Sequence, residues 1–242
     1  MIMVVTKKYR YQRIVLKLSG GALSSHDYNC DINCQIIKEI ACEIKVLIKN
    51  KIQVGVVVGG GNFFRGAKLA KTISRITGDH LGMIATALNA LAIYDIFMQL
   101  KIPTKIMSAI SIEGLLEHYN CYLANEYLNK GYVIIFAGGT GIPFVTTDTA
   151  LCVRGIELNA DLLLKATDVK GVYDSDPKKY PHAKFYSRLS YEEVLKKKIS
   201  VMDSFAFSLG SNYQMKICVF DLHKKGALLH IMQGLDEGTL IE

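Results

Sequence analysis

Two lysines stand inside otherwise apolar segments that read as β-strands. Lys17 lies in the run Arg-Ile-Val-Leu-Lys-Leu, directly before Ser19 and Gly20, and Lys165 lies in the run Leu-Leu-Leu-Lys-Ala, directly before Thr167. An ammonium group in such a strand loses its hydration and is stable there when it meets an anion. A lysine at a strand tip can instead extend its ammonium group to solvent. Because glycines and hydroxyl groups follow both lysines, we favour a polyphosphate ligand over that alternative.

Glycines follow two further strand-like runs. Gly59, Gly60 and Gly61 end one of them, and the segment 138–141 (Gly-Gly-Thr-Gly) ends the other. Consecutive glycines allow backbone N–H groups to approach a phosphate closely, although each loop alone is also compatible with a simple tight turn. Ligands of open parallel sheets bind beyond the carboxyl ends of the strands. The four strand ends together therefore predict one phosphate-binding edge.

The familiar phosphate-binding motifs are absent from the sequence. There is no GxxxxGK[ST] motif, which excludes a P-loop, and no HRD or DFG set, which excludes a protein kinase. The segment 59–66 does not match GxGxxG at the required offset, and no acidic residue ends a strand about 20 residues later. A dinucleotide-dependent oxidoreductase is therefore disfavoured.

Short β-branched runs alternate with helix-like segments along almost the whole chain. This alternation predicts an α/β fold, a three-layer αβα sandwich around a mainly parallel twisted sheet, with residues 1–242 as a single domain. Segment 172–188 is the least regular part and is expected to form surface loops. Strands are expected at 13–18, 53–58, 104–109, 132–137, 161–166, 216–221 and 238–241, and helices at 34–51, 80–100, 147–159, 191–198 and 226–232.

The composition is that of a globular protein: 242 residues, 50% hydrophobic and 21% charged, with 20 glycines and only 4 prolines. The net charge of +7 suits an anionic partner, but the charges are scattered, so a nucleic-acid binder rests on net charge alone. The densest basic cluster, Lys196–Lys198, is typical of a solvated helix face. The six cysteines form no CxxC pair; Cys30, Cys34 and Cys42 could share a helix face as metal ligands, but buried reduced thiols in a cytosolic protein are the favoured interpretation.

No targeting or membrane segment is expected. Basic residues interrupt the short apolar N-terminal run, which is unlike a signal peptide. The longest uncharged stretch, 131–147, contains four glycines and a proline, whereas a membrane-spanning helix needs about 20 predominantly apolar residues. A soluble, cytoplasmic protein is expected.

The order and spacing of several segments resemble the bacterial uridylate kinase (UMP kinase) family of the amino-acid kinase superfamily, essentially from end to end. The resemblance implies a homohexameric enzyme of pyrimidine nucleotide biosynthesis that makes UDP from UMP and ATP with Mg²⁺. The matching segments are Lys17–Gly20, Val58–Gly66, Gly78–His80, Gly139–Gly141, Pro143–Phe144, Thr146–Asp148, Lys165–Thr167, Gly171–Tyr173, Asp176–Pro177 and Val201–Asp203.

The resemblance also implies which residues bind ATP and UMP. It implies no protein side chain as a metal ligand. Three features depart from the family. Ile142 stands where most relatives have asparagine, and Gly21 where glutamate is usual. Segment 24–31 lacks the glycines that accompany activation by GTP in relatives. ATP is expected to contact Lys17, Leu18, Ser19, Gly20, Gly61, Arg65, Thr167, Tyr173 and Asp176. UMP is expected to contact Gly60, Asp79, Thr140, Gly141, Ile142, Pro143, Phe144, Val145, Thr146 and Thr147.

The chemistry of phosphoryl transfer assigns roles to four candidate catalytic residues. Lys17 would be the principal cation at the transferred phosphoryl group, Lys165 a second cation nearer the donor, and Arg65 a bidentate phosphate ligand. Asp148 would hold the lysines by charge-assisted hydrogen bonds, or it is a plain helix N-cap. No general base is required, because the acceptor oxygen is already ionised.

Two more aspartates are of interest. Asp79 would accept hydrogen bonds from ribose hydroxyls, or it caps a helix that starts at His80. Asp203 is singled out by the resemblance only, and its surroundings in the sequence are those of a turn aspartate.

Two other functions remain open at this point. The chain could be another enzyme of the same superfamily that phosphorylates a carboxylate or carbamate. It could also be a non-catalytic nucleotide-binding protein, although retention of Lys17, Asp148 and Lys165 disfavours that reading.

Overall fold

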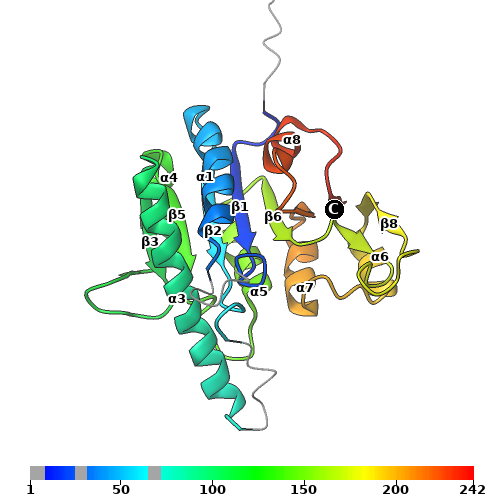
Figure 1. The fold of residues 1–242 in the computed structure, drawn as a ribbon, viewed down its shortest axis with the longest axis horizontal. Coiled ribbons are helices and arrows are strands. Elements are labelled where there is room, and N and C mark those ends of the chain that lie inside the picture. Colours follow the sequence, from blue (N-terminus) through cyan, green and yellow to red (C-terminus); the bar gives the residue numbers. More distant parts are fainter. Residues whose placement is uncertain (1–8, 25–31, 65–71) are drawn as a thin grey trace, which may run out of the picture.

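A twisted, mainly parallel sheet organises the chain in the computed structural model, which describes residues 9–24, 32–64 and 72–242 (Figure 1). The strands are β1 (Arg13–Leu18), β2 (Gln53–Val58), β3 (Thr104–Ser108), β4 (Glu117–His118), β5 (Val133–Ala137), β6 (Leu162–Thr167), β7 (Val172–Tyr173), β8 (Phe185–Tyr186), β9 (Arg188–Leu189), β10 (Ile217–Asp221) and β11 (Thr239–Ile241). The helices are α1 (Cys34–Lys49), α3 (Arg75–Gln99), α4 (Cys121–Asn129), α5 (Thr147–Glu157), α6 (Tyr191–Lys196), α7 (Ser204–Asn212) and α8 (Ala227–Gln233).

The strand order fixes where a ligand can bind. Nine of the strands in the described ranges form one sheet in the order β4-β3-β5-β2-β1-β6-β10-β11-β9, and β7 pairs with β8 separately. Only the β10–β11 pair in the large sheet is antiparallel. From β1 the chain builds the sheet outward through β2, and it returns to the other side of β1 with β6. The strand order thus reverses between β1 and β6, and in sheets of this type ligands bind at that switch point.

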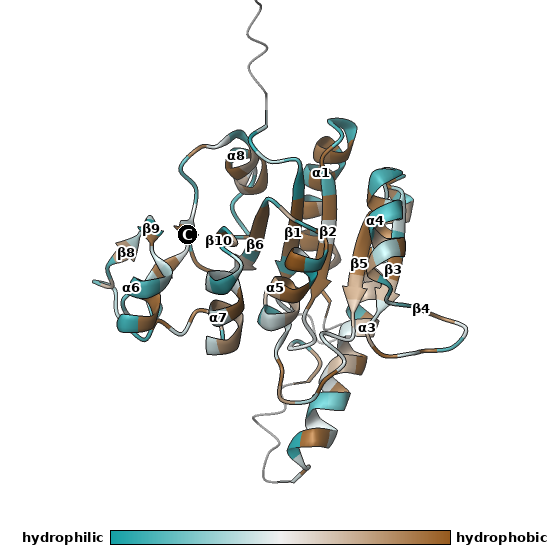
Figure 2. Ribbon diagram, turned by 180° about the vertical axis from the view of Figure 1, so that it is seen from behind, coloured by the Kyte–Doolittle hydropathy of each residue, from teal (hydrophilic) through white to brown (hydrophobic). Residues whose placement is uncertain are grey.

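Helices cover both faces of the sheet, as predicted for a three-layer αβα sandwich. The helices α1, α3 and α8 lie on one face, and α4, α5 and α7 on the other (Figures 1 and 2). Alternate strand residues serve the two cores: Ile14 and Leu16 pack in the first, whereas Val15 packs in the second. All three are fully buried, which explains why the strand sequences are almost continuously apolar.

Most expected elements lie within two residues of the observed ones, but the start of one helix and the cap of another differ. The helix expected from His80 begins at Arg75, where the Ser74 side chain accepts a hydrogen bond from the Thr77 N–H. Asp79 is therefore inside the helix and is not its cap. Helix α5 begins at Thr147 as expected, but its N-cap is Thr146 and Asp148 is the second helical residue.

The sequence analysis missed α4 and α7. Helix α4 is capped by Asn120 and α7 by Asp203, both of which accept hydrogen bonds from backbone N–H groups of the first turn. Both helices are short, and Ser and Gly in α7 weaken the helical signal. The expected surface loops at 172–188 contain the β7–β8 pair and the first residue of β9.

The cysteine expectation is partly wrong. Cys152 and Cys218 are buried thiols, but Cys34 and Cys42 are exposed on α1, and Cys121 is intermediate. Cys30 lies outside the described residues.

Helix α3 is long and apolar enough to cross a membrane on composition alone, with half of its most apolar window buried. It packs against α1, β3 and β5. These contacts make it a core helix of the sandwich.

Candidate active site

A buried ion triad lies at the switch point of the sheet. Lys17 and Lys165 are direct neighbours in the β1–β6 register, so their side chains leave the same face of the sheet. That face packs against α5, whose first turn carries Asp148. The Lys17 Nζ donates to Asp148 Oδ1 at 2.7 Å and the Lys165 Nζ to Asp148 Oδ2 at 2.8 Å. The aspartate bonds both lysines, so it is more than the plain N-cap considered above.

The triad is withdrawn from solvent. Side-chain exposure is 8% for Lys17, 10% for Lys165 and 12% for Asp148, so neither lysine extends its ammonium group into bulk water. Lys165 also donates to the carbonyl of Val201. Two cations share one carboxylate, which leaves the triad itself with an excess positive charge. Such a charge favours a polyanionic ligand.

Burial and charge act in opposite directions on these groups. Burial alone would raise the pKa of Asp148, but the ammonium groups of Lys17 and Lys165 outweigh it and the pKa lies below its ordinary value. Burial, followed by the nearby Lys17 charge, lowers the pKa of Lys165 to about 8, although Asp148 opposes the change. Lys165 thus titrates close to neutral pH in the free protein.

A cavity of about 400 Å³ opens beside Lys17. Its walls come from the two glycine-rich loops after β1 and β2. The loops approach so closely that a Cβ added at Gly20 would lie 2.2 Å from the backbone nitrogen of Gly61, which only glycine permits. The lining residues are Lys17, Ser19, Gly20, Gly21, Ala22, Gly59, Gly60, Gly61, Thr147 and Asp168.

A second cavity of about 450 Å³ adjoins the first and shares Gly60, Gly61 and Thr147 with it. It lies between α3 and the loop that follows β5. The Thr86 hydroxyl fixes the start of that loop, because it accepts a hydrogen bond from the Gly138 N–H at 2.6 Å. The lining residues are Gly60, Gly61, Phe64, Arg75, Gly78, Asp79, Gly82, Met83, Thr86, Gly138, Gly139, Thr140, Val145, Thr146 and Thr147.

Four residues expected to contact UMP do not line this second cavity: Gly141, Ile142, Pro143 and Phe144. Ile142 is 60% and Phe144 63% exposed. The departure from the family at Ile142 therefore changes a residue on the outer surface of the loop and not one on the cavity wall.

A third cavity, of about 360 Å³, carries two of the residues expected to contact ATP. Tyr173 and Asp176 line it, opposite Lys197 and Lys198. Thr167 ends β6, where its hydroxyl donates to the carbonyls of Val169 and Phe220.

Two other residues expected to contact ATP are placed differently. Leu18 is fully buried, so only its backbone could reach a ligand. Arg65 lies outside the described residues.

Asp203 connects the end of the loop between β5 and α5 to the start of α7. The sequence did not reveal this connection. Its carboxylate accepts from the hydroxyl groups of Thr146 and Thr149, the latter at 3.0 and 3.1 Å. It also accepts from the Ala206 N–H at 2.8 Å as the cap of α7. The contacts join the start of α5 to the start of α7, two segments that are more than 50 residues apart in the sequence, and no local pattern signals them.

Sequence reasoning also overlooked Arg75, which lines the second cavity. The spacing of Arg75 four residues before Asp79 was the available signal, since such pairs meet on one helix face.

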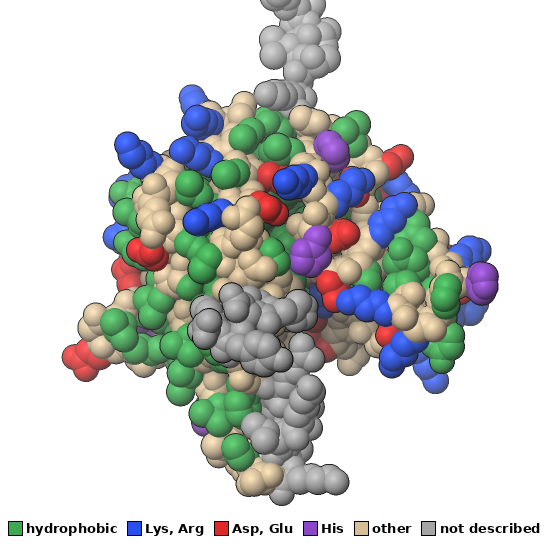
Figure 3. All heavy atoms as spheres, in the orientation of Figure 1, with side chains coloured by type: hydrophobic (Ala, Val, Ile, Leu, Met, Phe, Trp, Pro, Cys, Tyr) green, Lys and Arg blue, Asp and Glu red, His purple; other side chains and the backbone are tan. Residues whose placement is uncertain are grey.

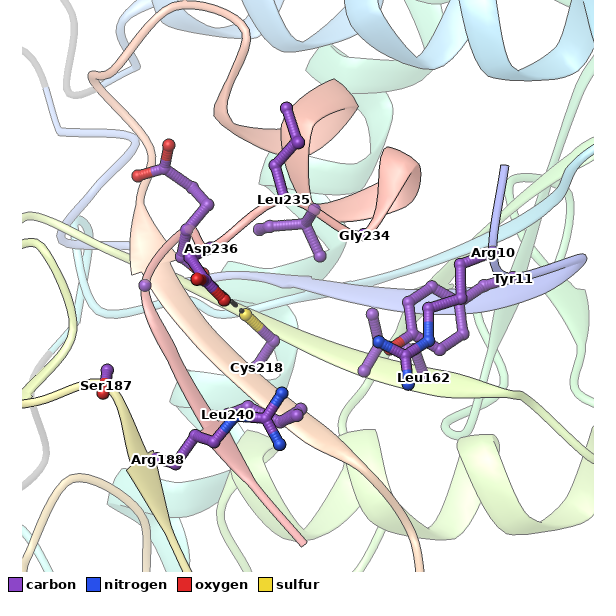
Figure 4. A pocket seen from close by; sticks show the side chains of 13 residues that line it. Arg10, Tyr11, Leu162, Ser187, Arg188, Cys218, Gly234, Leu235, Asp236 and Leu240 are labelled. Carbon is purple, nitrogen blue, oxygen red and sulfur yellow. Dashed lines mark hydrogen bonds between the residues drawn. The ribbon is translucent and has the colours of Figure 1, made fainter. Parts of the chain in front are cut away.

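One further cavity is unrelated to this edge of the sheet. It has about 60 Å³ and lies among Arg10, Cys218 and Leu240, near α8 (Figure 4). None of the residues expected to bind a ligand line it. Pockets for small molecules usually have about 300–1,000 Å³, so this cavity does not accommodate a nucleotide.

Comparison with known proteins gives consistent matches. The sequence profile of the amino acid kinase family matches residues 12–221. A uridylate kinase of Alcanivorax borkumensis is 50% identical over 234 residues, which cover 96% of this chain and 92% of that protein. A uridylate kinase of Buchnera aphidicola is 46% identical, covering 99% of this chain and 100% of its own length.

Solved structures agree with the sequence matches. The crystal structure of UMP kinase from Bacillus anthracis superposes with a TM-score of 0.91 at 37% identity, covering 96% of each chain. The UMP kinase of Ureaplasma parvum gives a TM-score of 0.89 at 33% identity, covering 96% of this chain and 99% of that one.

Proposed function

The chain belongs to the amino acid kinase family, within its uridylate kinases, and from this premise we propose that it is a UMP kinase that transfers the γ-phosphoryl group of ATP to UMP. The observation that carries the proposal is the buried triad of Lys17, Asp148 and Lys165 beside two adjoining cavities. Each cavity has the size of a small-molecule site. Lys17 lines the first of these cavities, and the residues that the two cavities share, Gly60, Gly61 and Thr147, mark where two polyanions could meet.

The two nucleotides would enter from opposite sides of the triad. ATP would occupy the side of Tyr173 and Asp176 and extend its phosphates to the glycine loop at 19–21. UMP would occupy the cavity beside Asp79 and turn its phosphate toward Gly60. The two phosphates would meet where the cavities share residues.

The reaction is an in-line displacement. An ionised oxygen of the UMP phosphate forms a bond to the γ-phosphorus of ATP, and the bond from that phosphorus to the bridging oxygen of ADP breaks. The products are UDP and ADP, and no proton must be removed from the acceptor. Lys17 and Lys165 neutralise the charge on the transferred group, while the loop N–H groups add fixed dipoles that stabilise it in the transition state.

Mg²⁺ is part of the proposal, as a companion of the nucleotide. The described residues contain no group of three or more His, Cys, Asp or Glu side chains that could hold a metal ion. Mg²⁺ is commonly bound through substrate phosphates and water, with one or two carboxylates. When bound, the ion would neutralise phosphate charge. We assign it no dedicated protein cage.

Three wider properties complete the proposal. The continuous nine-stranded sheet of the described residues supports one domain over 1–242, with the acceptor site mainly in its N-terminal part and the ATP site mainly in its C-terminal part. An exposed apolar stripe on α3 supports a homohexamer. The enzyme would act in the cytoplasm in pyrimidine nucleotide biosynthesis, without a nucleic acid or membrane partner.

A coupled assay of ADP release tests the function, with UMP, CMP and AMP compared side by side. We expect rapid turnover with UMP and little with the other two. The Lys17→Ala variant should lower turnover by roughly 100-fold or more, as when transition-state charge stabilisation is lost. Acetylglutamate, aspartate and carbamate test the carboxylate and carbamate alternative, which the identity to uridylate kinases disfavours. Activity on one of those acceptors and none on UMP would refute the proposal.

A further inference from the structure

Phe144 has a backbone conformation that its position in the chain does not explain. Six non-glycine residues of the described ranges have positive φ. Five of them lie two residues after the end of a helix, where a left-handed residue commonly closes the last turn: Lys51, Lys101, Asn159, Lys198 and Gln214. Phe144, with φ of 70°, lies in the middle of the loop between β5 and α5. A bulky side chain in this region is strained and persists where the surroundings hold it.

Two residues of α3 hold Phe144 in place. The Phe144 N–H donates to Asp79 Oδ2 at 2.7 Å. The Arg75 Nε donates to both oxygens of the same carboxylate, at 3.0 and 2.9 Å. The Arg75 guanidinium carbon also lies 5.7 Å from the centre of the Phe144 ring, within cation–π range. Arg75, Asp79 and Phe144 thus form a closed set of contacts, which we call the Arg75 clasp.

Two members of the clasp belong to the wall of the second cavity, the proposed UMP site, which we call the acceptor cavity. Arg75 and Asp79 line that cavity, and the loop fixed by Phe144 supplies its opposite wall through Thr140 and Thr146. A carboxylate offers about four acceptor positions. The Arg75 Nε and the Phe144 N–H use three of them, which leaves one for a nucleotide hydroxyl. The orientation of Asp79 toward a ligand therefore depends on Arg75.

We propose that Arg75 is a positioning residue for the acceptor nucleotide: it orients Asp79 and, through it, fixes the loop 140–146 against α3. The inference rests on the proposed function, because the cavity is the proposed UMP site. Without Arg75 the carboxylate turns freely and the strained loop residue loses its anchor. The acceptor then binds less tightly, whereas the ATP side and the lysine triad keep their contacts.

Steady-state kinetics with Arg75→Gln test the proposal. We expect the KM for UMP to rise about tenfold, the size expected when a hydrogen bond to a charged group is lost. The KM for ATP and kcat should stay within about twofold of the wild type. Arg75→Lys should recover part of the loss, because an ammonium group can pair with Asp79 but lacks the planar fork and the flat face of guanidinium. An unchanged KM for UMP in a folded Arg75→Gln variant would overturn the proposal.

The chain offers a matched control. Lys130 and Glu126 form another ion pair one helical turn apart, at the C-terminal end of α4 and away from the cavity; 3.7 Å separates Lys130 Nζ from Glu126 Oε2. Lys130→Gln should leave all three kinetic constants unchanged. An equal rise in the KM for UMP in this variant would show that the effect of Arg75→Gln is general and would overturn the proposal.

A double-mutant cycle separates action through Asp79 from direct contact. If Arg75 acts through Asp79, Arg75→Gln should add little to the KM of an Asp79→Asn variant. Full additivity of the two changes would overturn the positioning role. Binding of UMP alone, measured by calorimetry, serves as a second readout. A wild-type protein that binds UMP but releases no ADP would refute the proposed function, and equal UMP affinity of Arg75→Gln and wild type would refute the inference.

Discussion

At the scale of single residues, the site depends on two buried cations that share one carboxylate. Removing the carboxylate from such a set leaves uncompensated buried charge, which typically costs about 3–5 kcal/mol. Asp148→Asn keeps the size of the side chain but leaves Lys17 and Lys165 facing each other. We expect the free energy of unfolding at pH 7 to fall by about 3 kcal/mol in urea titrations. Turnover should fall as well, because the lysines lose their fixed orientation.

A surface ion pair provides the control for this variant. Arg188 Nη1 and Glu242 Oε1 lie 3.1 Å apart, with 62% and 38% of their side chains exposed. Exposed pairs contribute about 0–1 kcal/mol. Arg188→Gln should therefore change stability by less than about 1 kcal/mol. A comparable loss in both variants would contradict the special role of the triad.

The lowered pKa of Lys165 makes a second prediction at this scale. Its pKa is about 8 in the folded protein against an ordinary 10.5, so the unfolded chain binds more protons between these pH values. The contribution of Lys165 to stability thus increases as pH rises from about 8 to 10.5. Catalytic activity should instead decrease as pH rises through this range, because the reaction needs the charged ammonium group of Lys165.

The measurement is a pH profile of kcat/KM, which reports the free enzyme. We expect a decline centred near pH 8 in the wild type. Lys165→Arg, whose guanidinium stays charged, should lack this decline whatever its absolute rate. A wild-type profile that stays flat to about pH 9.5 would show that Lys165 is not the titrating cation.

At the scale of secondary-structure elements, the close approach of the loops after β1 and β2 shapes the cavity beside Lys17. A Cβ at Gly20 would lie 2.2 Å from the Gly61 nitrogen, whereas a Cβ at Gly61 would have its nearest neighbour, the Gly21 nitrogen, at 4.0 Å. Gly20→Ala should therefore separate the loops and lower the melting temperature. Gly61→Ala should keep the melting temperature of the wild type but raise the KM for ATP, because its methyl group would enter the cavity beside Lys17. Equal melting temperatures for the two variants would contradict this packing.

How much could be predicted from the sequence depends on how local each signal is. The strands with Lys17 and Lys165 are almost continuously apolar runs. The pattern therefore predicted the sheet, its mainly parallel strands and the edge at which the two lysines lie. Contacts between distant segments could not. Asp148 reaches Lys17 across 131 positions, and Asp203 reaches Thr146 across 57. A short helix such as α7 depends on its cap and its packing, which a hydrophobic period does not reveal.

At the scale of the whole molecule, α3 presents an apolar stripe to solvent. Ile76, Ile84, Leu88 and Met98 are 46–50% exposed. At 100° per residue they fall within about a third of the helix circumference. Hydrophobic side chains gather over this part of the surface (Figure 3). An extended apolar stripe is unusual on a monomer and typical of an interface.

The proposed homohexamer places a second copy of α3 on this stripe. A helix stripe that packs on itself forms a twofold contact, and a closed hexamer then needs a second, different interface. Breaking only the α3 contact should therefore produce smaller assemblies and not unfolded chains. We expect the wild type to have six chain masses in sedimentation velocity. Ile84→Asp combined with Leu88→Asp should give three or fewer, with an unchanged circular dichroism spectrum.

Tyr122 supplies the control, because it is 80% exposed on α4, far from the stripe. Tyr122→Ser should retain six chain masses. A monomeric wild type would refute the hexamer itself, whereas a hexameric double variant would place the interface elsewhere on the surface. The active site adds a functional consequence, since Asp79 and Arg75 lie on the same helix as the stripe. A second copy packed on α3 would hold the N-terminal end of that helix, which carries Arg75 and Asp79, in place. The Ile84→Asp, Leu88→Asp variant should therefore have a raised KM for UMP and an unchanged KM for ATP.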